Sequence, residues 1–219
     1  MRTLCLLVLA LTGTASAQPN ANGAAHTVPF GATGNELELS VANGSASTQG
    51  AVVSLTEAPA WVHVQPAEVP LGEIASGEEA TAAFQFDLDP DSPVGEAAPI
   101  RFTVSTGTGG AVEKEVWVEA APPASFRLVG AYPNPLGGPA GARATIAYEL
   151  PEPAEVLLSV YDVLGRRVAT VVDARQEPGR REGVWEAAGA ASGLYLWQLV
   201  VESGYGTRHV ERGKLTLTR

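Results

Sequence analysis

The chain has 219 residues, with 24 acidic and 14 basic side chains and a formal net charge of −10. Residues 18–124 hold 14 Asp and Glu against 2 Lys and Arg, a net charge of −12, whereas residues 125–219 hold 10 against 11, a net charge of +1. An acidic first half repels phosphate groups, which argues against nucleic acid and anionic membrane surfaces as its partners. The unequal charge also predicts two modules.

The first 17 residues have the three parts of a secretory signal peptide. A positively charged start is followed by an apolar run at residues 4–11 and by small residues at 15–17. Cleavage is predicted between Ala17 and Gln18, and the apolar run is shorter than the ~20 residues needed to span a bilayer. The single cysteine, Cys5, lies in this leader, so the secreted chain would have neither a disulfide nor a thiol nucleophile.

The first module follows a flexible segment at residues 18–25 and is expected to span residues 26–119. Its apolar side chains alternate with polar ones, as in Phe84, Phe86 and Leu88, which indicates strands with one buried face. Six or seven short strands without a helical period predict an immunoglobulin-like β-sandwich. These strands are expected at residues 36–41, 51–56, 61–64, 80–88, 100–105 and 112–119, with turn residues between them.

An acidic run at residues 87–91 raises the question of calcium binding. An EF-hand loop starting at residue 87 would need Gly at position 92 and Glu at position 98, where the chain has Ser92 and Ala98. A solvated turn is the prediction here, and a different calcium loop that includes Glu96 stays open as the alternative.

No catalytic, metal or cofactor site is predicted. The three histidines, at positions 26, 63 and 209, are scattered and do not have metal-ligand spacing. The sequence also lacks a Gly-rich phosphate loop, a nucleophile elbow and an HExxH helix. We therefore expect a protein that is not an enzyme.

A Pro/Ala linker at residues 120–124 separates the modules, because two prolines beside small residues favour an extended spacer. The second module, residues 125–219, opens on Tyr132-Pro133-Asn134-Pro135, a rigid entry loop in which proline fixes φ on both sides of Asn134. It is expected to form a second immunoglobulin-like β-sandwich. Its strands are expected at residues 145–148, 155–161, 168–172, 181–187, 194–201 and 214–218.

Residues 161–168 predict a tight hairpin turn between two of these strands. Asp162 can hydrogen-bond forward into the turn backbone, and Gly165 supplies the positive φ that such a turn requires. After the hairpin, Trp185 is expected in the core. Gly193 would allow close backbone approach or a positive φ before a strand that carries Tyr195 and Trp197 on one face.

The order and spacing of these motifs resemble the C-terminal sorting domain of proteins exported by the bacterial type IX secretion system. The resemblance covers about residues 127–219, a stretch that includes a YPNP entry, a VYDVLGR hairpin, an SG.Y segment and a final strand near a lysine. The matching positions singled out as the sorting motif are Tyr132, Pro133, Asn134, Pro135, Asp162, Gly165, Arg166, Gly193, Tyr195 and Lys214.

This resemblance implies a non-enzymatic protein that passes through the periplasm and is placed on the extracellular face of the outer membrane or released. Its implied partners are the type IX translocon and sortase, with processing near the linker and surface lipopolysaccharide as a candidate anchor. The first module, which is similar to secreted Ig-like accessory domains, would be the cargo. Because the chain ends on a strand, we also expect a free sheet edge that a receptor could extend.

Two other functions stay in competition. The first module could be an adhesion module that binds a surface polysaccharide or protein, which is compatible with export. The hairpin also resembles the Ig-like domain of flagellar hook-capping proteins, which implies a structural scaffold. A secretory leader and a sorting-type terminus argue against the flagellar role.

Overall fold

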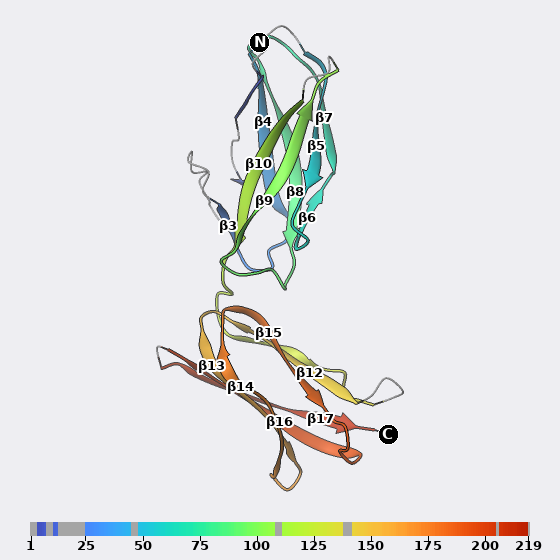
Figure 1. Cartoon of the computed structure of the whole chain (residues 1–219), viewed down its shortest axis with the longest axis vertical. Coiled ribbons are helices and arrows are strands. Elements are labelled where there is room, and N and C mark those ends of the chain that lie inside the picture. Colours follow the sequence, from blue (N-terminus) through green and yellow to red (C-terminus); the bar gives the residue numbers. More distant parts are fainter. Residues whose placement is uncertain are drawn as a thin grey trace. The chain divides into compact units, whose positions relative to one another are not determined.

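The computed structural model of the chain describes residues 4–7, 11–12, 25–44, 48–107, 111–137, 142–204 and 206–218. Within these ranges every regular element is a β-strand, and the chain divides into two compact units, Met1–Ala121 and Pro122–Arg219 (Figure 1). The all-β prediction is confirmed. The described part of the chain contains no helix that is long and apolar enough to cross a membrane.

The first unit consists of two sheets packed as a sandwich. One sheet has the strand order β1-β4-β8-β6, with β2 also paired to β4, and the other has the order β3-β10-β9-β5-β7. The strands are β1 (Leu4–Leu7), β2 (Leu11–Thr12), β3 (His26–Val28), β4 (Asn35–Asn43), β5 (Thr48–Glu57), β6 (Val62–Gln65), β7 (Glu68–Ile74), β8 (Glu79–Leu88), β9 (Ala97–Ser105) and β10 (Ala111–Ala120).

The core of the first unit forms because apolar residues alternate along strands of both sheets. In β8, Phe84, Phe86 and Leu88 are buried while the residues between them are exposed. Phe84 meets Phe102 of the opposite sheet with a ring-centroid distance of 4.8 Å. The apolar stripes predicted from the sequence therefore face each other across the sandwich.

Four strands of the first unit were not expected from the sequence: β1 and β2, which lie in the predicted leader, and β3 and β7. β7 contains Pro70 and Gly72, which read as turn residues, but β7 is the edge strand of its sheet, where a missing N–H is tolerated. β3 has three residues, too few to show an alternating pattern, and it pairs in parallel with β10. Ala120, expected to open the linker, is instead the buried last residue of β10.

The second unit is a smaller sandwich. One sheet has the order β11-β12-β15, and the other, called sheet D below, has the order β14-β13-β16-β17. The strands are β11 (Arg127–Tyr132), β12 (Arg143–Leu150), β13 (Ala154–Asp162), β14 (Arg167–Gln176), β15 (Gly179–Glu186), β16 (Gly193–Ser203) and β17 (Arg208–Leu217). β11 was not predicted, and β17 begins at Arg208 instead of position 214.

Aromatic side chains fill much of the second core. Trp185 is buried as predicted, and its ring lies 4.8 Å from that of Tyr195. Tyr195 and Trp197 are both buried on the inner face of sheet D. The sheets come close together at Gly183, where an added Cβ would lie 2.4 Å from Cδ2 of Leu158.

Candidate functional site: one end of sheet D

Asp162 organises the turn between β13 and β14. Its Oδ1 accepts hydrogen bonds from the backbone N–H groups of Leu164 and Arg166, both at 3.0 Å, and its Oδ2 pairs with Nε of Arg166 at 2.7 Å. Gly165 has a φ of +78°, and its N–H donates to the Asp162 carbonyl at 3.0 Å. The predicted hairpin is confirmed in its turn chemistry.

The same contacts set the charge state of Asp162. Desolvation raises the pKa of its carboxyl group, but hydrogen bonds and the positive charge from Arg166, with a further bond from Leu164, outweigh it and leave the pKa below its ordinary value. The carboxylate form is therefore the one that holds the turn.

The entry loop lies along the outer edge of β17. Asn134 donates from Nδ2 to the carbonyl of Lys214 at 3.0 Å and accepts from the N–H of Thr216 at 2.9 Å. Leu136 continues the contact: its N–H donates to the Thr216 carbonyl at 2.8 Å, and its carbonyl accepts from the N–H of Thr218 at 2.9 Å. The peptide bonds before Pro133 and Pro135 are both cis.

The expectation that the last strand offers a free edge is wrong for residues 214–218. Asn134 and Leu136 take up the main-chain groups of Lys214, Thr216 and Thr218 that point away from β16. Leu136 also forms an isolated parallel bridge with Leu217. The YPNP segment thus acts as a short cover strand, which is one way in which proteins protect a sheet edge.

The remaining motif residues support this arrangement. The Tyr132 ring is 43% exposed and its hydroxyl donates to Glu182 at 3.1 Å. The Tyr195 hydroxyl donates to the carbonyl of Ala191 at 2.8 Å, which closes the connection before β16, and Gly193 opens that strand with a φ of +158°. Tyr195 therefore has a packing role.

The register of sheet D brings the separate motifs together. Tyr161 pairs with Leu196, which pairs with Lys214 on the next strand. One row further, Asp162 is opposite Tyr195. The hairpin, the SG.Y segment, the final lysine and the entry loop that contacts it all lie at one end of sheet D, although they are spread over residues 132–216 of the chain.

Sequence reasoning did not identify the exposed apolar residues at this end. Leu164 is 77% exposed and Val163 is 64% exposed at the tip of the hairpin. We call the full set the sheet-end patch, and it consists of Val163, Leu164, Val168, Leu194 and Leu196. The positions of these residues in the sequence could have indicated their exposure. Val163 and Leu164 are in a turn, and Leu194 and Leu196 alternate with the buried Tyr195 and Trp197.

The acidic run of the first unit does not converge on a metal. Asp87 accepts a hydrogen bond from the N–H of Gly34 at 2.6 Å, and Asp89 lies 3.1 Å from Nε2 of His63. Among the residues that the structure describes, no group of three His, Cys, Asp or Glu side chains could hold a metal ion. The described geometry therefore supplies no calcium loop at residues 87–91.

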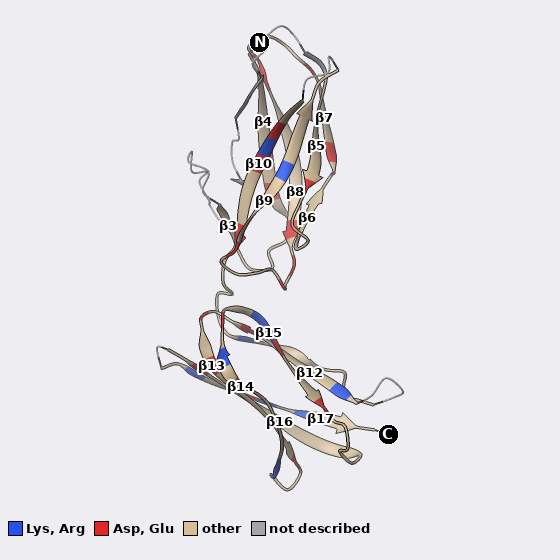
Figure 2. Ribbon diagram, in the orientation of Figure 1, with Lys and Arg blue, Asp and Glu red and all other residues tan. Residues whose placement is uncertain are grey.

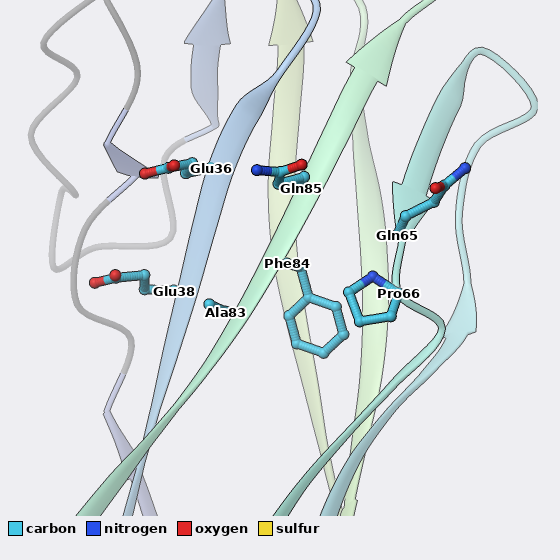
Figure 3. Close-up of a pocket in the computed structure, with 7 residues that line it drawn as sticks. All are labelled: Glu36, Glu38, Gln65, Pro66, Ala83, Phe84 and Gln85. Carbon is cyan, nitrogen blue, oxygen red and sulfur yellow. The ribbon is translucent and has the colours of Figure 1, made fainter.

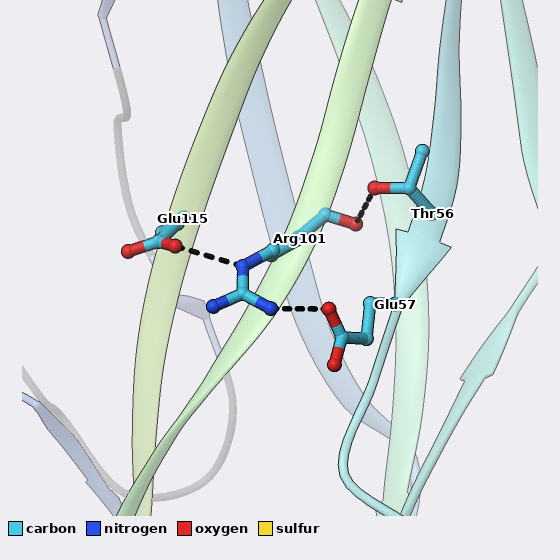
Figure 4. Close-up of polar contacts among 4 residues, drawn as sticks. All are labelled: Thr56, Glu57, Arg101 and Glu115. Carbon is cyan, nitrogen blue, oxygen red and sulfur yellow. Dashed lines mark hydrogen bonds and ion pairs between the residues drawn. The ribbon is translucent and has the colours of Figure 1, made fainter.

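Acidic residues occur in strands of both sheets of the first unit (Figure 2). On the outer face of the second sheet, Arg101 joins three strands: it donates to Glu115 at 2.8 Å and to Glu57, and its carbonyl accepts from Thr56 at 3.0 Å (Figure 4). The Arg101 side chain therefore links β5, β9 and β10.

An open hollow of about 520 Å³ lies over the outer face of the first sheet (Figure 3). Carboxylates of β4 and amides of β6 and β8 contribute to its wall. Its lining residues are Glu36, Glu38, Gln65, Pro66, Ala83, Phe84 and Gln85. A hollow of this composition can hydrogen-bond to a polar ligand.

Part of the expected leader is paired with this sheet. β1 and β2 both run antiparallel to β4, with Leu4 opposite Asn43 and Thr12 opposite Glu36. The expected cleavage position, Ala17–Gln18, lies outside the described residues.

Comparison with known proteins gives distant structural likenesses. No protein-family model and no curated protein matches the chain. Dimeric latent PorU from Porphyromonas gingivalis is 13% identical with a TM-score of 0.34, and the match covers 99% of this chain but 20% of that one. A protein of unknown function from P. gingivalis W83 is also 13% identical, over 86% of this chain and 93% of that one, with a TM-score of 0.33. At such TM-scores these likenesses identify neither a family nor an activity.

Proposed function

We propose that the chain is a non-enzymatic exported protein whose second unit is the address read by a type IX secretion translocon and whose first unit is the cargo. The observation that carries the proposal is the sheet-end patch. Eight of the nine large apolar side chains that are exposed in the described residues belong to the second unit, and five of them form this patch. Exposed apolar residues gathered beside a set of ordered polar motifs are typical of a protein-binding surface.

The exposed apolar area of the sheet-end patch favours a protein partner. Complete burial of a Val or Leu side chain stabilises a complex by about 1.5–3 kcal/mol. Leu164 and Val163 keep most of their surface in water because the Asp162 contacts hold the turn away from the core. A receptor that covers the turn would gain most of that free energy without refolding the hairpin.

Sortase processing is proposed near the linker. Ala124 and Ser125 are exposed between Pro123, which is buried, and β11. These residues lie at the start of the second unit, just after its boundary with the first, and an exposed segment of this kind can be bound by a peptidase as an extended chain. Attachment of the cleaved cargo to surface lipopolysaccharide is part of the same proposal.

Deleting the last six residues is a poor test, because Leu215 and Leu217 are core residues and their loss would unfold the unit. The sharper variant is Val163→Ser with Leu164→Ser, which leaves the core intact. We expect periplasmic accumulation and an at least about tenfold loss of surface display, since about 1.5 kcal/mol per lost contact exceeds the 1.4 kcal/mol that a factor of ten requires.

The matched control is Val184→Ser with Val210→Ser, two exposed valines outside the patch. This control should be displayed like the parent. If both double variants reach the surface equally, or if a cell without the translocon still exports the parent chain, the proposal is wrong.

A second candidate function, binding of a surface glycan or protein by the first unit, is favoured by the hollow that contains Glu36, Glu38, Gln65 and Gln85. Paired carboxylates and amides are suited to sugar hydroxyl groups. A glycan array with residues 25–121 tests this candidate, and Gln85→Ala should abolish any hit. An array without hits would exclude binding of a surface glycan by the first unit.

A further inference from the structure

We propose that removal of the leader opens the edge of β4 and that this edge then binds an extended segment of another protein, apolar at alternate positions and basic at the positions between. The inference rests on the proposed export route, because it requires cleavage between Ala17 and Gln18. It concerns a surface of the cargo unit, and no contact of the second unit enters it.

The leader itself shows that the edge accepts a strand. Residues Leu4–Leu7 pair antiparallel with positions 40–43 of β4, and Leu11–Thr12 pair with positions 36–37. The opposite edge of β4 is paired with β8 from Asn35 to Ala42. β4 is therefore a central strand only while the leader is present (Figure 1). After the leader is removed, the N–H and C=O groups on the outer edge of β4 no longer have these hydrogen-bond partners.

The edges of the second sheet, β7 and the β3 side of β10, are protected by residues of the unit itself. β7 carries Pro70 and register shifts against β5. β3 covers the edge of β10, and the N–H of Ala121 donates to the Val28 carbonyl at 2.8 Å. β4 has nine residues without Pro or Lys, and so it lacks the usual devices that block strand addition.

The two faces of β4 specify the occupant. Leu37, Leu39 and Val41 are fully buried behind the edge, so a bound strand must present apolar residues to that side. On the outer side β4 carries Glu36 and Glu38 in a unit of net charge −12, which favours Lys or Arg opposite them. A second copy of β4 does not fit, because antiparallel pairing would bring the glutamates of two copies together.

The experiment uses recombinant residues 18–219, the full chain and two capped, labelled octapeptides. The probe peptide alternates Val with Lys, and the control peptide has four Val followed by four Lys. We expect saturable one-to-one binding of the probe to residues 18–219 by fluorescence anisotropy. The full chain should bind it at least tenfold more weakly, because its leader occupies the edge, and the control peptide should not bind.

Two variants of residues 18–219 locate the site. Glu36→Lys with Glu38→Lys should weaken probe binding about tenfold or more, whereas Glu73→Lys with Glu113→Lys, a change of the same charge at exposed positions elsewhere, should weaken it less. Hydrogen exchange of the β4 amides should slow when the probe binds. Equal binding by the full chain, equal effects of the two double variants, or no binding of the probe would each overturn the inference.

These outcomes are separate from a failure of the export proposal. The mass of the protein recovered from the host surface shows whether the leader is removed, whereas the peptide experiment begins with a chain that lacks it. Leader removal together with no probe binding would overturn only the β4 inference.

Discussion

Asn134 and Thr216 lie 82 positions apart in the chain, and the Oδ1 of Asn134 accepts a hydrogen bond from the Thr216 N–H at 2.9 Å. The same side chain donates to the Lys214 carbonyl at 3.0 Å. One amide group therefore satisfies a donor and an acceptor on the open side of the last strand. This arrangement explains why the YPNP segment needs an asparagine, since neither a carboxylate nor a hydroxyl presents one fixed acceptor and one fixed donor in the same planar group.

Replacing Asn134 should loosen the end of β17. Asn134→Ala removes both hydrogen bonds, and we expect a loss of about 1–3 kcal/mol in the free energy of unfolding. Urea denaturation measures this loss, and hydrogen exchange should show faster exchange of the Thr216 amide. Asn134→Asp keeps the acceptor and loses the donor, so its effect should be intermediate. An Asp variant as unstable as the Ala variant would contradict this account.

Gly213 is needed because the Trp197 indole lies against its backbone. An added Cβ would lie 2.5 Å from Cε2 of Trp197, a ring that is buried and cannot swing away. Gly213→Ala should therefore destabilise the second unit by about 1–3 kcal/mol, the usual cost of overpacking a core. Gly204→Ala is the matched control, because nothing lies within 4 Å of its added Cβ. Thermal unfolding followed by tryptophan fluorescence would contradict the prediction if both variants melted alike.

Tyr148 should make stability depend on pH in the alkaline range. Its ring is buried, its hydroxyl donates to Gln176 at 2.8 Å, and burial raises its pKa from 10.0 to about 12. Because the folded pKa is the higher one, this contribution is complete below pH 10 and is lost as the pH rises toward 12. The loss amounts to about 2–3 kcal/mol for a shift of this size.

Tyr148→Phe tests whether ionisation of Tyr148 lowers the stability of the parent as the pH rises. The variant should be less stable than the parent by about 1 kcal/mol at pH 8, because the hydrogen bond to Gln176 is gone. The difference should shrink and then reverse as the pH approaches 12, because only the parent loses stability through this group. Urea denaturation at several pH values measures the difference, and parallel curves would rule out the effect.

Asp162 should act through its charged form. Because its pKa is lowered in the folded state, its contribution to stability is present above the pKa of the unfolded chain and is lost as the pH falls through the folded value. Asp162→Ala should speed amide exchange at Leu164 and Arg166 near neutral pH. At low pH the amide exchange rates of the parent should approach those of Asp162→Ala.

Asp162→Asn separates the negative charge of Asp162 from its hydrogen bonds to the turn. Its oxygen can still accept from the two turn amides, but it cannot form the ion pair with Arg166. We expect exchange rates between those of the parent and those of Asp162→Ala, and no acid dependence from this position. Exchange in the Asn variant as fast as in the Ala variant would show that the charge alone holds the hairpin.

The hairpin and the strand faces could be predicted because their causes are local. Asp162 and Gly165 act on a turn of their own residues, and Tyr195 and Trp197 share a face by simple alternation. β7 was not predicted because Pro70 indicates a turn unless the strand is known to lie at a sheet edge. β3 was not predicted because its partner strand, β10, is distant in the chain.

The order of apolar and polar residues by itself determined that this chain folds as all-β and which face of each predicted strand enters the core, since alternation acts between neighbours. Only the tertiary structure decided that Asn134 covers the last strand, that the separate motifs meet at one end of sheet D, and that Val163 and Leu164 stand in water beside them. Those relationships depend on register between strands that are far apart in the chain. Register is set by the packing of whole sheets, which no short segment encodes.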